Sequence, residues 1–298
     1  MSKISVVINT LNEEKNIARA LDSVKWANEV IVCDMYSEDS TVEIAKKREA
    51  RVIHHKKTGY VEPARNFAIS EAQNEWILVL DADEEISDTL KEQILQIISK
   101  DEASFVEIPR KNIIFGKWVK ASQWWPDYHI RLFQKGKVTW SDKIHSKPKT
   151  DGIGLKIQPE ESLAIIHHHY QDTSQYLGRM LNYSQIQAKE LFNEGKEFHW
   201  QDLIREPLSE FLGRYFANKG YQDGMHGLAL SLLQAISFLL VYIQLWEMHN
   251  FKEQEIGLTD FKREIKEGGY QINYWINFNM LSKNRLKRVF QKVINKVG

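Results

Sequence analysis

The fold is decided by residues 76–84, which read Trp76-Ile77-Leu78-Val79-Leu80-Asp81-Ala82-Asp83-Glu84. Five apolar residues in a row indicate a strand buried on both faces, as in a parallel sheet covered by helices. Asp81 and Asp83 lie two positions apart, so in extended backbone their carboxylates would point the same way. They follow the carboxyl end of the strand, where open α/β sheets bind ligands. The pair predicts a Mg²⁺ or Mn²⁺ site, and the alternative is that either aspartate only caps the next helix.

Strands and helices alternate on both sides of this stretch. β-branched runs predict strands at residues 3–9, 29–34, 51–54 and 75–80. Amphipathic segments predict helices at residues 12–24, 40–48, 63–72 and 88–99. This alternation predicts a parallel, doubly wound α/β sheet. Beyond residue 103 we expect short strands at 104–108, 113–115, 129–133 and 137–140, and then helices at 176–193, 201–218 and 227–248.

The composition excludes some classes of protein. The 298-residue chain has 40 basic and 40 acidic residues, so no overall field points to nucleic acid. The one cysteine, Cys33, forms no internal disulfide and fits a reducing compartment. The chain runs from Met1 directly into a strand-like segment without a signal peptide, which predicts a cytoplasmic start.

Two segments raise the question of a membrane. Residues 227–246 carry no formal charge and are long enough to span a bilayer, although their glutamines and serines favour a buried or half-embedded helix. Residues 283–296 contain six basic residues and no acidic one, interleaved with apolar residues. Such a basic amphipathic helix suits an anionic bilayer, and it could equally dock on its own protein.

Polar residues follow the ends of several predicted strands. Asn12-Glu13-Glu14 comes after the first strand, Asp34 ends the second, and Arg65 opens the helix before the Asp81 strand. Each alone fits a helix cap or a surface charge, but together at one sheet edge they suit a nucleotide diphosphate. The sequence has no G-x-G-x-x-G and no G-x-x-x-x-G-K-[ST], which argues against dinucleotide oxidoreductases and P-loop enzymes.

Four motifs resemble the family 2 glycosyltransferases of the GT-A fold. They are Val6-Val7-Ile8-Asn9-Thr10-Leu11-Asn12-Glu13-Glu14, Asp34-x-x-Ser37-x-Asp39-x-Thr41, Ala64-Arg65-Asn66 and Asp81-Ala82-Asp83-Glu84. Gly116-Lys117-Trp118, Trp125-Pro126-Asp127-Tyr128, Arg131-Leu132-Phe133, Pro207-Leu208, Lys219-Gly220-Tyr221-Gln222-Asp223-Gly224 and Trp246-Glu247 look like the subgroup that adds glucose to the inner core of bacterial lipopolysaccharide or lipooligosaccharide. The chain departs from the family at Tyr36 and Ser40, where glycines are common, and at His145-Ser146, where a His-Glu pair is usual.

The resemblance implies an architecture. It would be an α/β, GT-A type nucleotide-binding domain over residues 1–170, with a mostly parallel sheet flanked by helices. Residues 1–100 would bind the nucleotide sugar and residues 101–170 the acceptor. Residues 171–298 would form a helical C-terminal extension, whose apolar and basic segments suggest association with a membrane.

The resemblance also implies roles for single residues. Thr10, Asn12, Glu13, Asp34, Arg65, Asp81 and Asp83 would bind the nucleotide sugar, with Asp34 reading the nucleobase and Asp83 ligating Mg²⁺ or Mn²⁺ between the phosphates. An inverting transfer also needs one base opposite the leaving group. Asp127 is the candidate, with a pKa that a partly desolvated sugar site would raise, and the alternative is an ion pair between Asp127 and Arg131. Trp125, Arg131 and His145 are candidates for the acceptor site.

The expected function is transfer of a sugar, with glucose preferred, from a UDP-sugar to a lipid-linked glycan on the inner face of the membrane. A nucleotidyltransferase is the first alternative, but it should carry a glycine-rich loop after its first strand, and residues 10–16 contain no glycine. A non-catalytic nucleotide-sugar or glycan binder is the second alternative. The presence of Asp81, Asp83 and Asp127 argues against it.

Overall fold

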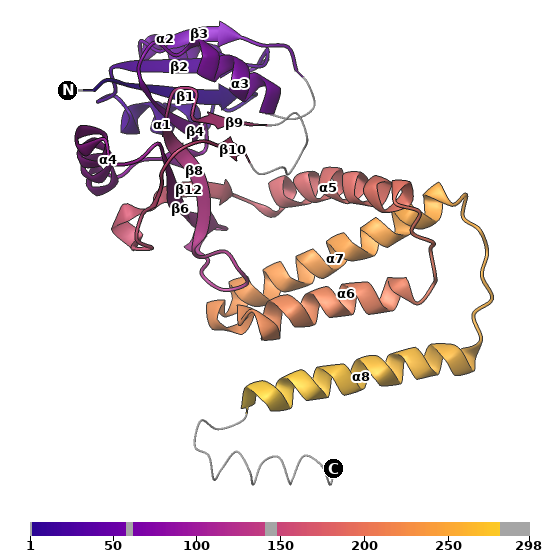
Figure 1. The fold of residues 1–298 in the computed structure, drawn as a ribbon. Coiled ribbons are helices and arrows are strands. Elements are labelled where there is room, and N and C mark those ends of the chain that lie inside the picture. Colours follow the sequence, from indigo (N-terminus) through magenta and orange to yellow (C-terminus); the bar gives the residue numbers. More distant parts are fainter. Residues whose placement is uncertain (1, 58–61, 141–147, 281–298) are drawn as a thin grey trace, which may run out of the picture. The chain divides into compact units, whose positions relative to one another are not determined.

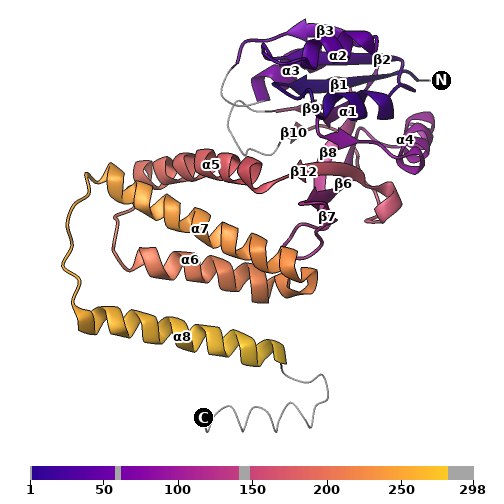
Figure 2. The same ribbon diagram turned by 180° about the vertical axis from the view of Figure 1, so that it is seen from behind.

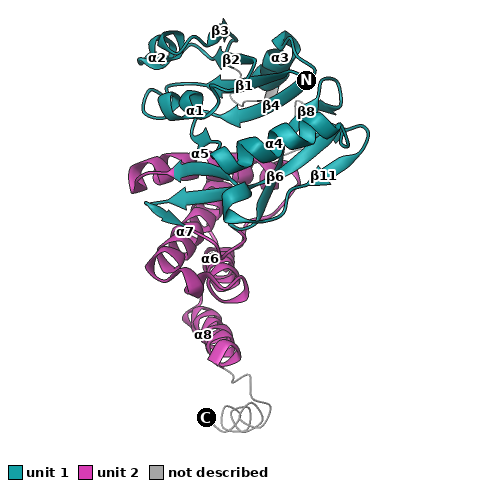
Figure 3. Ribbon diagram, turned by 90° about the vertical axis from the view of Figure 1, so that its left-hand side faces the viewer, with its two compact units in different colours: residues 1–118, 124–169 teal, residues 119–123, 170–298 magenta. Residues whose placement is uncertain are grey.

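The computed structural model describes residues 2–57, 62–140 and 148–280. The chain divides into two compact units (Figure 3). The first contains Met1–Trp118 and Trp124–His169, and the second contains Val119–Gln123 and Tyr170–Gly298. His145 and the basic segment 283–296 lie outside the described residues.

The first unit is built on a ten-stranded sheet of order β3-β2-β1-β4-β8-β6-β12-β5, with β7 and β11 attached to β6. Four strands run parallel to one another: β1 (Ile4–Thr10), β2 (Glu29–Asp34), β3 (Arg51–His54) and β4 (Trp76–Asp81). The next strand, β8 (Asp127–Gln134), is antiparallel to β4. The start of β8 therefore lies at the carboxyl end of β4, where the sequence places Asp81.

The rest of the sheet comes from the section with short expected strands. β6 (Phe105–Ile114) is one continuous strand where we expected two, and it pairs with β8 and with β7 (Lys117–Trp118), as Figure 2 shows from behind. β12 (Ile165–Tyr170) is antiparallel to β5 (Glu84–Glu85), and β11 (Gly154–Lys156) is parallel to β6. β9 (Val138–Thr139) and β10 (Lys149–Thr150) form a separate pair.

Helices cover both faces of the parallel strands, as expected (Figure 1). Along β4, Trp76, Leu78 and Leu80 share a core with residues of α1 (Ile17–Ser23), α2 (Thr41–Lys47) and α4 (Asp88–Lys100). The alternate residues Ile77 and Val79 share a second core with α3 (Glu62–Glu71). The uninterrupted apolar run of β4 is thus explained by burial on both sides.

The second unit is helical: α5 (Thr173–Asn193), α6 (Asp202–Leu212), α7 (Met225–Met248) and α8 (Leu258–Met280), with a π-helical turn at Gly213–Ala217, η2, and a 3-10 turn at Gly220–Asp223, η3. α8 was not expected from the sequence. Arg205 of α6 holds it through a two-pronged ion pair with Glu264, at 2.6 and 2.7 Å. Gly268 of α8 also approaches Leu208 so closely that a Cβ there would lie 2.8 Å from the leucine Cδ2.

α7 contains the apolar stretch 227–246. Within the described residues it is the one helix long and apolar enough to cross a membrane, and only 33 % of its most apolar stretch is buried. Leu232, Ile236 and Ile243 are exposed along it.

Candidate active site

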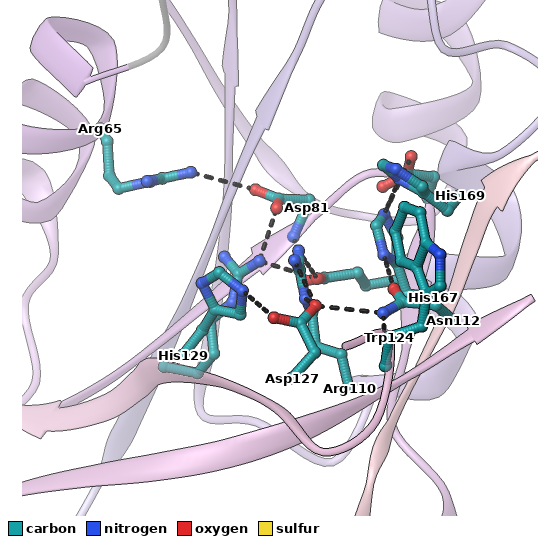
Figure 4. A network of polar contacts seen from close by, with 12 residues as sticks. Arg65, Asp81, Arg110, Asn112, Trp124, Asp127, His129, His167 and His169 are labelled. Carbon is teal, nitrogen blue, oxygen red and sulfur yellow. Dashed lines mark hydrogen bonds and ion pairs between the residues drawn. The ribbon is translucent and has the colours of Figure 1, made fainter. Parts of the chain in front are cut away.

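Asp81, the last residue of β4, faces Arg65 (Figure 4) and also contacts Arg131. Its Oδ1 accepts a 3.2 Å hydrogen bond from Arg65 of α3, and its Oδ2 accepts one of 2.5 Å from Arg131 of β8. Burial raises the pKa of Asp81, but the charges of Arg131 and Arg65 outweigh it and hold the pKa well below the ordinary value. Asp81 is therefore ionised at any physiological pH.

Asp81 and Asp83 do not lie in one stretch of extended backbone. The backbone turns at Ala82 and Asp83, so the two-residue alternation of a strand does not apply to the pair, and that expectation was wrong. The Asp83 carboxylate is buried, with Oδ2 3.6 Å from Nε2 of His167 on β12. Asp81 thus lies beside two arginines, whereas Asp83 lies beside a histidine.

Glu84 is a fully buried carboxylate that contacts two arginines, Arg131 beside Asp81 and Arg110 of β6. Its Oε1 lies 2.7 Å from Arg131 and 3.4 Å from Arg110, and its Oε2 accepts from the backbone N–H of Asp81 at 2.9 Å. Arg131 is itself only 4 % exposed and is committed to Asp81 and Glu84. Its geometry suits a residue that anchors Asp81 better than one that contacts an acceptor at the surface.

Asp127 opens β8 and is surrounded by donors. Its Oδ2 accepts from Arg110 at 2.9 and 2.7 Å and from Asn112 at 3.1 Å, and its Oδ1 lies 2.9 Å from His129 Nε2. The arginine partner is Arg110 of β6, directly opposite in the strand register, so the alternative of an ion pair with Arg131 was wrong. Asp127 and His129 lie two positions apart on β8, and the register of β8 on β6 is irregular at Arg131, between Ile130 and Leu132.

The pKa of Asp127 departs from the expectation in direction. Burial raises this pKa, as argued from the sequence. The hydrogen bond from His129 and the charge of Arg110 lower the pKa by more than burial raises it. The net pKa lies well below the ordinary aspartate value. The prediction of a raised pKa was wrong because it considered desolvation without the arginine on the neighbouring strand.

A chain of hydrogen bonds connects Asp127 to the neighbourhood of Asp83. Asn112 donates to Asp127, and its Oδ1 lies 2.6 Å from Nδ1 of His167. His169, two residues further on β12, approaches His167 at 3.2 Å and packs against Trp124 at 5.6 Å between ring centroids. Figure 4 shows these residues converging from β6, β8 and β12 on the end of β4.

The residues predicted on the first two strand ends form an ordered pair of loops. Asn12 bridges them, since its N–H donates to Ser37 Oγ at 2.8 Å and its Oδ1 accepts from the Glu38 N–H at 2.8 Å. The Glu13 N–H donates to Thr41 Oγ1 at 2.8 Å. Thr10, at the end of β1, is buried, and among the described residues its hydroxyl has no hydrogen-bond partner.

Asp34 is nearly inaccessible, with 1 % of its surface exposed. Its carboxylate accepts from the backbone N–H of Ser37 at 3.0 Å and from the Ser37 hydroxyl at 2.5 Å. Contact with a nucleobase would therefore require one of these bonds to yield, and the base-reading role stays a prediction. Beside it Tyr36, 64 % exposed, stacks on His54 at 5.5 Å between ring centroids.

Of the three acceptor candidates, Trp125 is half-buried and packs edge-on against Trp118 at 5.1 Å between ring centroids. His145 lies outside the described residues. The sequence did not single out Arg110, Asn112, Glu84, His129, His167 or His169. The available signal was the two-residue alternation of polar side chains within otherwise apolar strands, at residues 110 and 112, 127, 129 and 131, and 167 and 169.

The donor set around Asp83 fits a divalent cation that also binds phosphates. Within the described residues no three histidine, cysteine, aspartate or glutamate side chains are placed to hold a metal. Asp83 and His167 supply one carboxylate and one imidazole. Mg²⁺ and Mn²⁺ sites that act on phosphates use one or two protein carboxylates and take their remaining ligands from water and substrate oxygen, which matches this set.

Comparisons with known proteins identify the family of this chain. The family model described as "Glycosyl transferase family 2" matches residues 5–147. An uncharacterized glycosyltransferase of Rickettsia typhi is 32 % identical over 302 residues, covering 98 % of this chain and 100 % of its own length. The lipopolysaccharide core biosynthesis glycosyltransferase LpsC of Rhizobium meliloti is 22 % identical over 257 residues, covering 84 % of this chain and 94 % of its own length. The solved structure of S. aureus TarS, residues 1–349, is similar with a TM-score of 0.43 at 16 % identity, covering 81 % of this chain and 91 % of that one.

The doubly wound strands, the carboxylates at the end of β4 and the full-length match to a glycosyltransferase agree with one another. The protein belongs to glycosyl transferase family 2 and is a glycosyltransferase of the GT-A type.

Proposed function

We propose that this glycosyltransferase is an inverting enzyme that moves a sugar, glucose by preference, from a UDP-sugar to a hydroxyl group of a lipid-linked glycan of the lipopolysaccharide or lipooligosaccharide core. The observation that carries the proposal is the cluster at the end of β4. There Asp81 is bound by Arg65 and Arg131, and Asp83 and Asp127 lie on either side of one hydrogen-bonded chain. The similarity to a named lipopolysaccharide core enzyme supports the acceptor class.

The donor half of this site supports binding of a diphosphate. Arg65 keeps 11 % of its side chain exposed and packs over the Trp140 ring at 5.5 Å, so its guanidinium is held in one place. A fixed guanidinium binds phosphate oxygens without a reorganisation cost. A divalent ion held by Asp83 beside His167 would neutralise the negative charge that develops on the departing UDP. Thr10, Asn12, Glu13 and Asp34 would order the loops that receive the nucleotide.

The acceptor half supports removal of a proton. Inversion requires that the acceptor hydroxyl approach the anomeric carbon from the side opposite UDP and lose its proton to one base. Asp127 is the carboxylate around which that base site is built, and Trp124 and Trp125 provide ring surfaces of the kind on which sugars stack. His145 is a further candidate for contact with the acceptor.

The second unit supports a location at the inner face of the membrane. α7 exposes Leu232, Ile236 and Ile243, and residues 283–296 add six basic residues in the sequence. An apolar surface and a basic segment are the two signals that stable peripheral binding requires. A lipid-linked acceptor would be reached from this position.

The test is a panel of nucleotide sugars with Mn²⁺ or Mg²⁺, in which the release of free nucleotide is measured with and without core glycan. We expect UDP-glucose to give the fastest release and the acceptor to increase the rate. Asp81→Asn should lose this turnover, whereas Asp151→Asn, an exposed aspartate paired with Lys137, serves as the matched control and should keep it. Equal, metal-independent rates for all donors, or no release with any donor, would contradict the proposal.

A further inference from the structure

We propose that His129, rather than Asp127, is the group that takes the proton of the acceptor hydroxyl, and that Asp127 acts as the positioning residue that holds His129 in its proton-accepting form. This inference rests on the proposed function, because it concerns the base of the same transfer. It starts from the two residues that lie 2.9 Å apart at the open end of β8.

The Asp127 carboxylate is already engaged through both of its oxygens. Arg110 donates two hydrogen bonds and Asn112 donates one to Oδ2, and His129 occupies Oδ1. A carboxylate that accepts this many bonds, one of them from a guanidinium, strongly favours its charged form. To accept a substrate proton it would have to surrender part of this network, and it would be a weak base at neutral pH.

The neighbouring imidazole has the free lone pair that the carboxylate lacks. An ionised carboxylate can only accept, so the ring nitrogen that faces it, Nε2, must carry the hydrogen. In the neutral ring the lone pair then belongs to Nδ1, for which the described residues provide no hydrogen-bond partner. The His129 side chain is 42 % exposed, whereas that of Asp127 is 25 % exposed.

The charges around His129 keep it neutral before reaction. Burial lowers the pKa of His129, the hydrogen bond to Asp127 raises it, and the charges of Arg110 and Arg131 lower it again. The resulting pKa of His129 lies below the ordinary histidine value, so the ring is unprotonated at neutral pH. Once a proton arrives, the Asp127 carboxylate stabilises the resulting imidazolium, which is the division of labour found in other aspartate-histidine pairs.

The step balances without a further reactant. The acceptor O–H bond breaks as its proton goes to the Nδ1 lone pair, and the oxygen electron pair forms the bond to the anomeric carbon. The bond from that carbon to the diphosphate oxygen breaks, and its electron pair leaves with UDP. The imidazolium, donating through Nε2 to Asp127, later returns its proton to water.

The experiment compares the full-length wild type with His129→Gln and His129→Ala. Glutamine keeps an amide that can donate to Asp127 but has no titratable lone pair. We expect His129→Gln to lower kcat for transfer by about 10²–10⁴-fold, the loss typical of a missing general base, with the affinity for UDP unchanged. Added imidazole should restore part of the lost turnover to His129→Ala and give nothing to the wild type. His249→Gln, whose ring contacts Lys196 and Phe192 in the second unit, is the matched histidine control and should keep normal turnover.

Two further readouts separate this role from a merely structural one. The wild-type kcat should fall as the pH drops through the His129 pKa, below the ordinary value of about 6.5, and the residual activity of His129→Gln should lack that dependence. Nitrogen NMR of the wild type without substrate should show His129 protonated on Nε2 and not on Nδ1 at neutral pH. Turnover of His129→Gln within about threefold of wild type, or an Nδ1–H tautomer, would overturn the proposal. A wild type that transfers from no nucleotide sugar would contradict the proposed function instead, and the NMR result would still decide the tautomer.

Discussion

Asp81 and Asp127 are two carboxylates that arginines keep ionised, yet their surroundings differ in one respect. Both oxygens of Asp81 face guanidinium groups, from Arg65 and Arg131. Asp127 gives one oxygen to Arg110 and Asn112 and the other to His129. The first carboxylate lies in a cluster whose charges do not titrate near neutral pH, whereas the second is coupled to a ring that does.

Under the proposed function, this difference would separate the two tasks of a glycosyl transfer. Fixed charges suit the donor half, because a diphosphate is bound best by groups that need not reorganise. A titratable partner suits the acceptor half, because a proton must move there. Glu84 touches both Arg131 and Arg110 and so joins the two halves into one buried network.

The largest loss of turnover is expected when the proposed metal ion is removed, because this should abolish the function of the donor half alone. Asp83→Ala, or excess chelator with the wild type, should remove transition-state stabilisation of several kcal/mol, about three orders of magnitude or more in turnover. Thermal unfolding in the absence of ligand should show that the variant stays folded. Full transfer in excess chelator would refute the assignment of a divalent ion.

Asp127→Asn tests the acceptor half. The neutral amide can no longer stabilise the protonated ring of His129 as the carboxylate does, so transfer should fall by about two to four orders of magnitude. The dissociation constant of the UDP-sugar, measured by calorimetry, should stay within a few-fold of wild type, because Asp81, Arg65 and Asp83 are unchanged. Loss of donor binding in Asp127→Asn would show that the two halves are not separable.

The variant Arg131→Met tests how much the buried network around Asp81 contributes to the stability of the fold. It leaves Asp81 and Glu84 buried without their shared guanidinium, so we expect a loss of about 3–5 kcal/mol in the free energy of unfolding. Arg48→Met is the matched control, because Arg48 forms an ion pair with the exposed Asp22 at 3.1 Å, and losing this pair should cost about 1 kcal/mol or less. Chemical denaturation of both variants measures the difference. Equal losses would mean that the buried network contributes no more than a surface pair.

The lowered pKa of Asp127 predicts a pH dependence of stability. Because its pKa is lower in the folded than in the unfolded state, the carboxylate stabilises the fold fully above the unfolded value of about 3.9. That contribution declines as the pH falls below the unfolded pKa toward the folded one. To remove the coupled ring, the comparison is made in a His129→Gln background: the difference in unfolding free energy between His129→Gln and His129→Gln/Asp127→Asn should be constant above about pH 5 and shrink below about pH 4. A difference that is already shrinking between pH 7 and pH 5 would contradict the lowered pKa.

The smallest effect on the fold is expected in the second unit. Ile236 is 46 % exposed on α7, so Ile236→Glu should change stability by less than about 0.5 kcal/mol. It should nevertheless shift the protein from the membrane fraction to the soluble fraction and make it easier to extract with high salt or alkali. Ile236→Leu is the control. An unchanged distribution would count against α7 as part of the membrane surface, and a need for detergent would favour a spanning helix.

The sequence predicted the first hundred residues closely because their signals are local. Apolar runs such as that of β4 and caps such as Ser87, whose Oγ accepts from the Leu90 N–H at 3.2 Å, act over a few residues. α8 was missed because Gly268 and Gly269 lower its helix propensity, and contacts with α6 stabilise it instead.

The site was predicted in part for the same reason. Asp81, Asp83 and Arg65 could be found from their places at element ends. Arg110, which reverses the expected shift in the pKa of Asp127, lies 17 residues away in sequence and meets it only through the register of β6 and β8. Glu84 was hidden among neighbouring acids, since no local pattern shows which acid of Asp81-Ala82-Asp83-Glu84 turns inward to meet arginines from two other strands.

The central claim is a single displacement with one base opposite the leaving group, and the anomeric configuration of the product tests it most directly. NMR of the glycan formed from an α-linked UDP-sugar, such as UDP-glucose, should show a β-linked sugar in the first product detected. An α-linked product would contradict the account, because retention of configuration requires a mechanism other than direct attack by an acceptor whose proton goes to the Asp127–His129 pair.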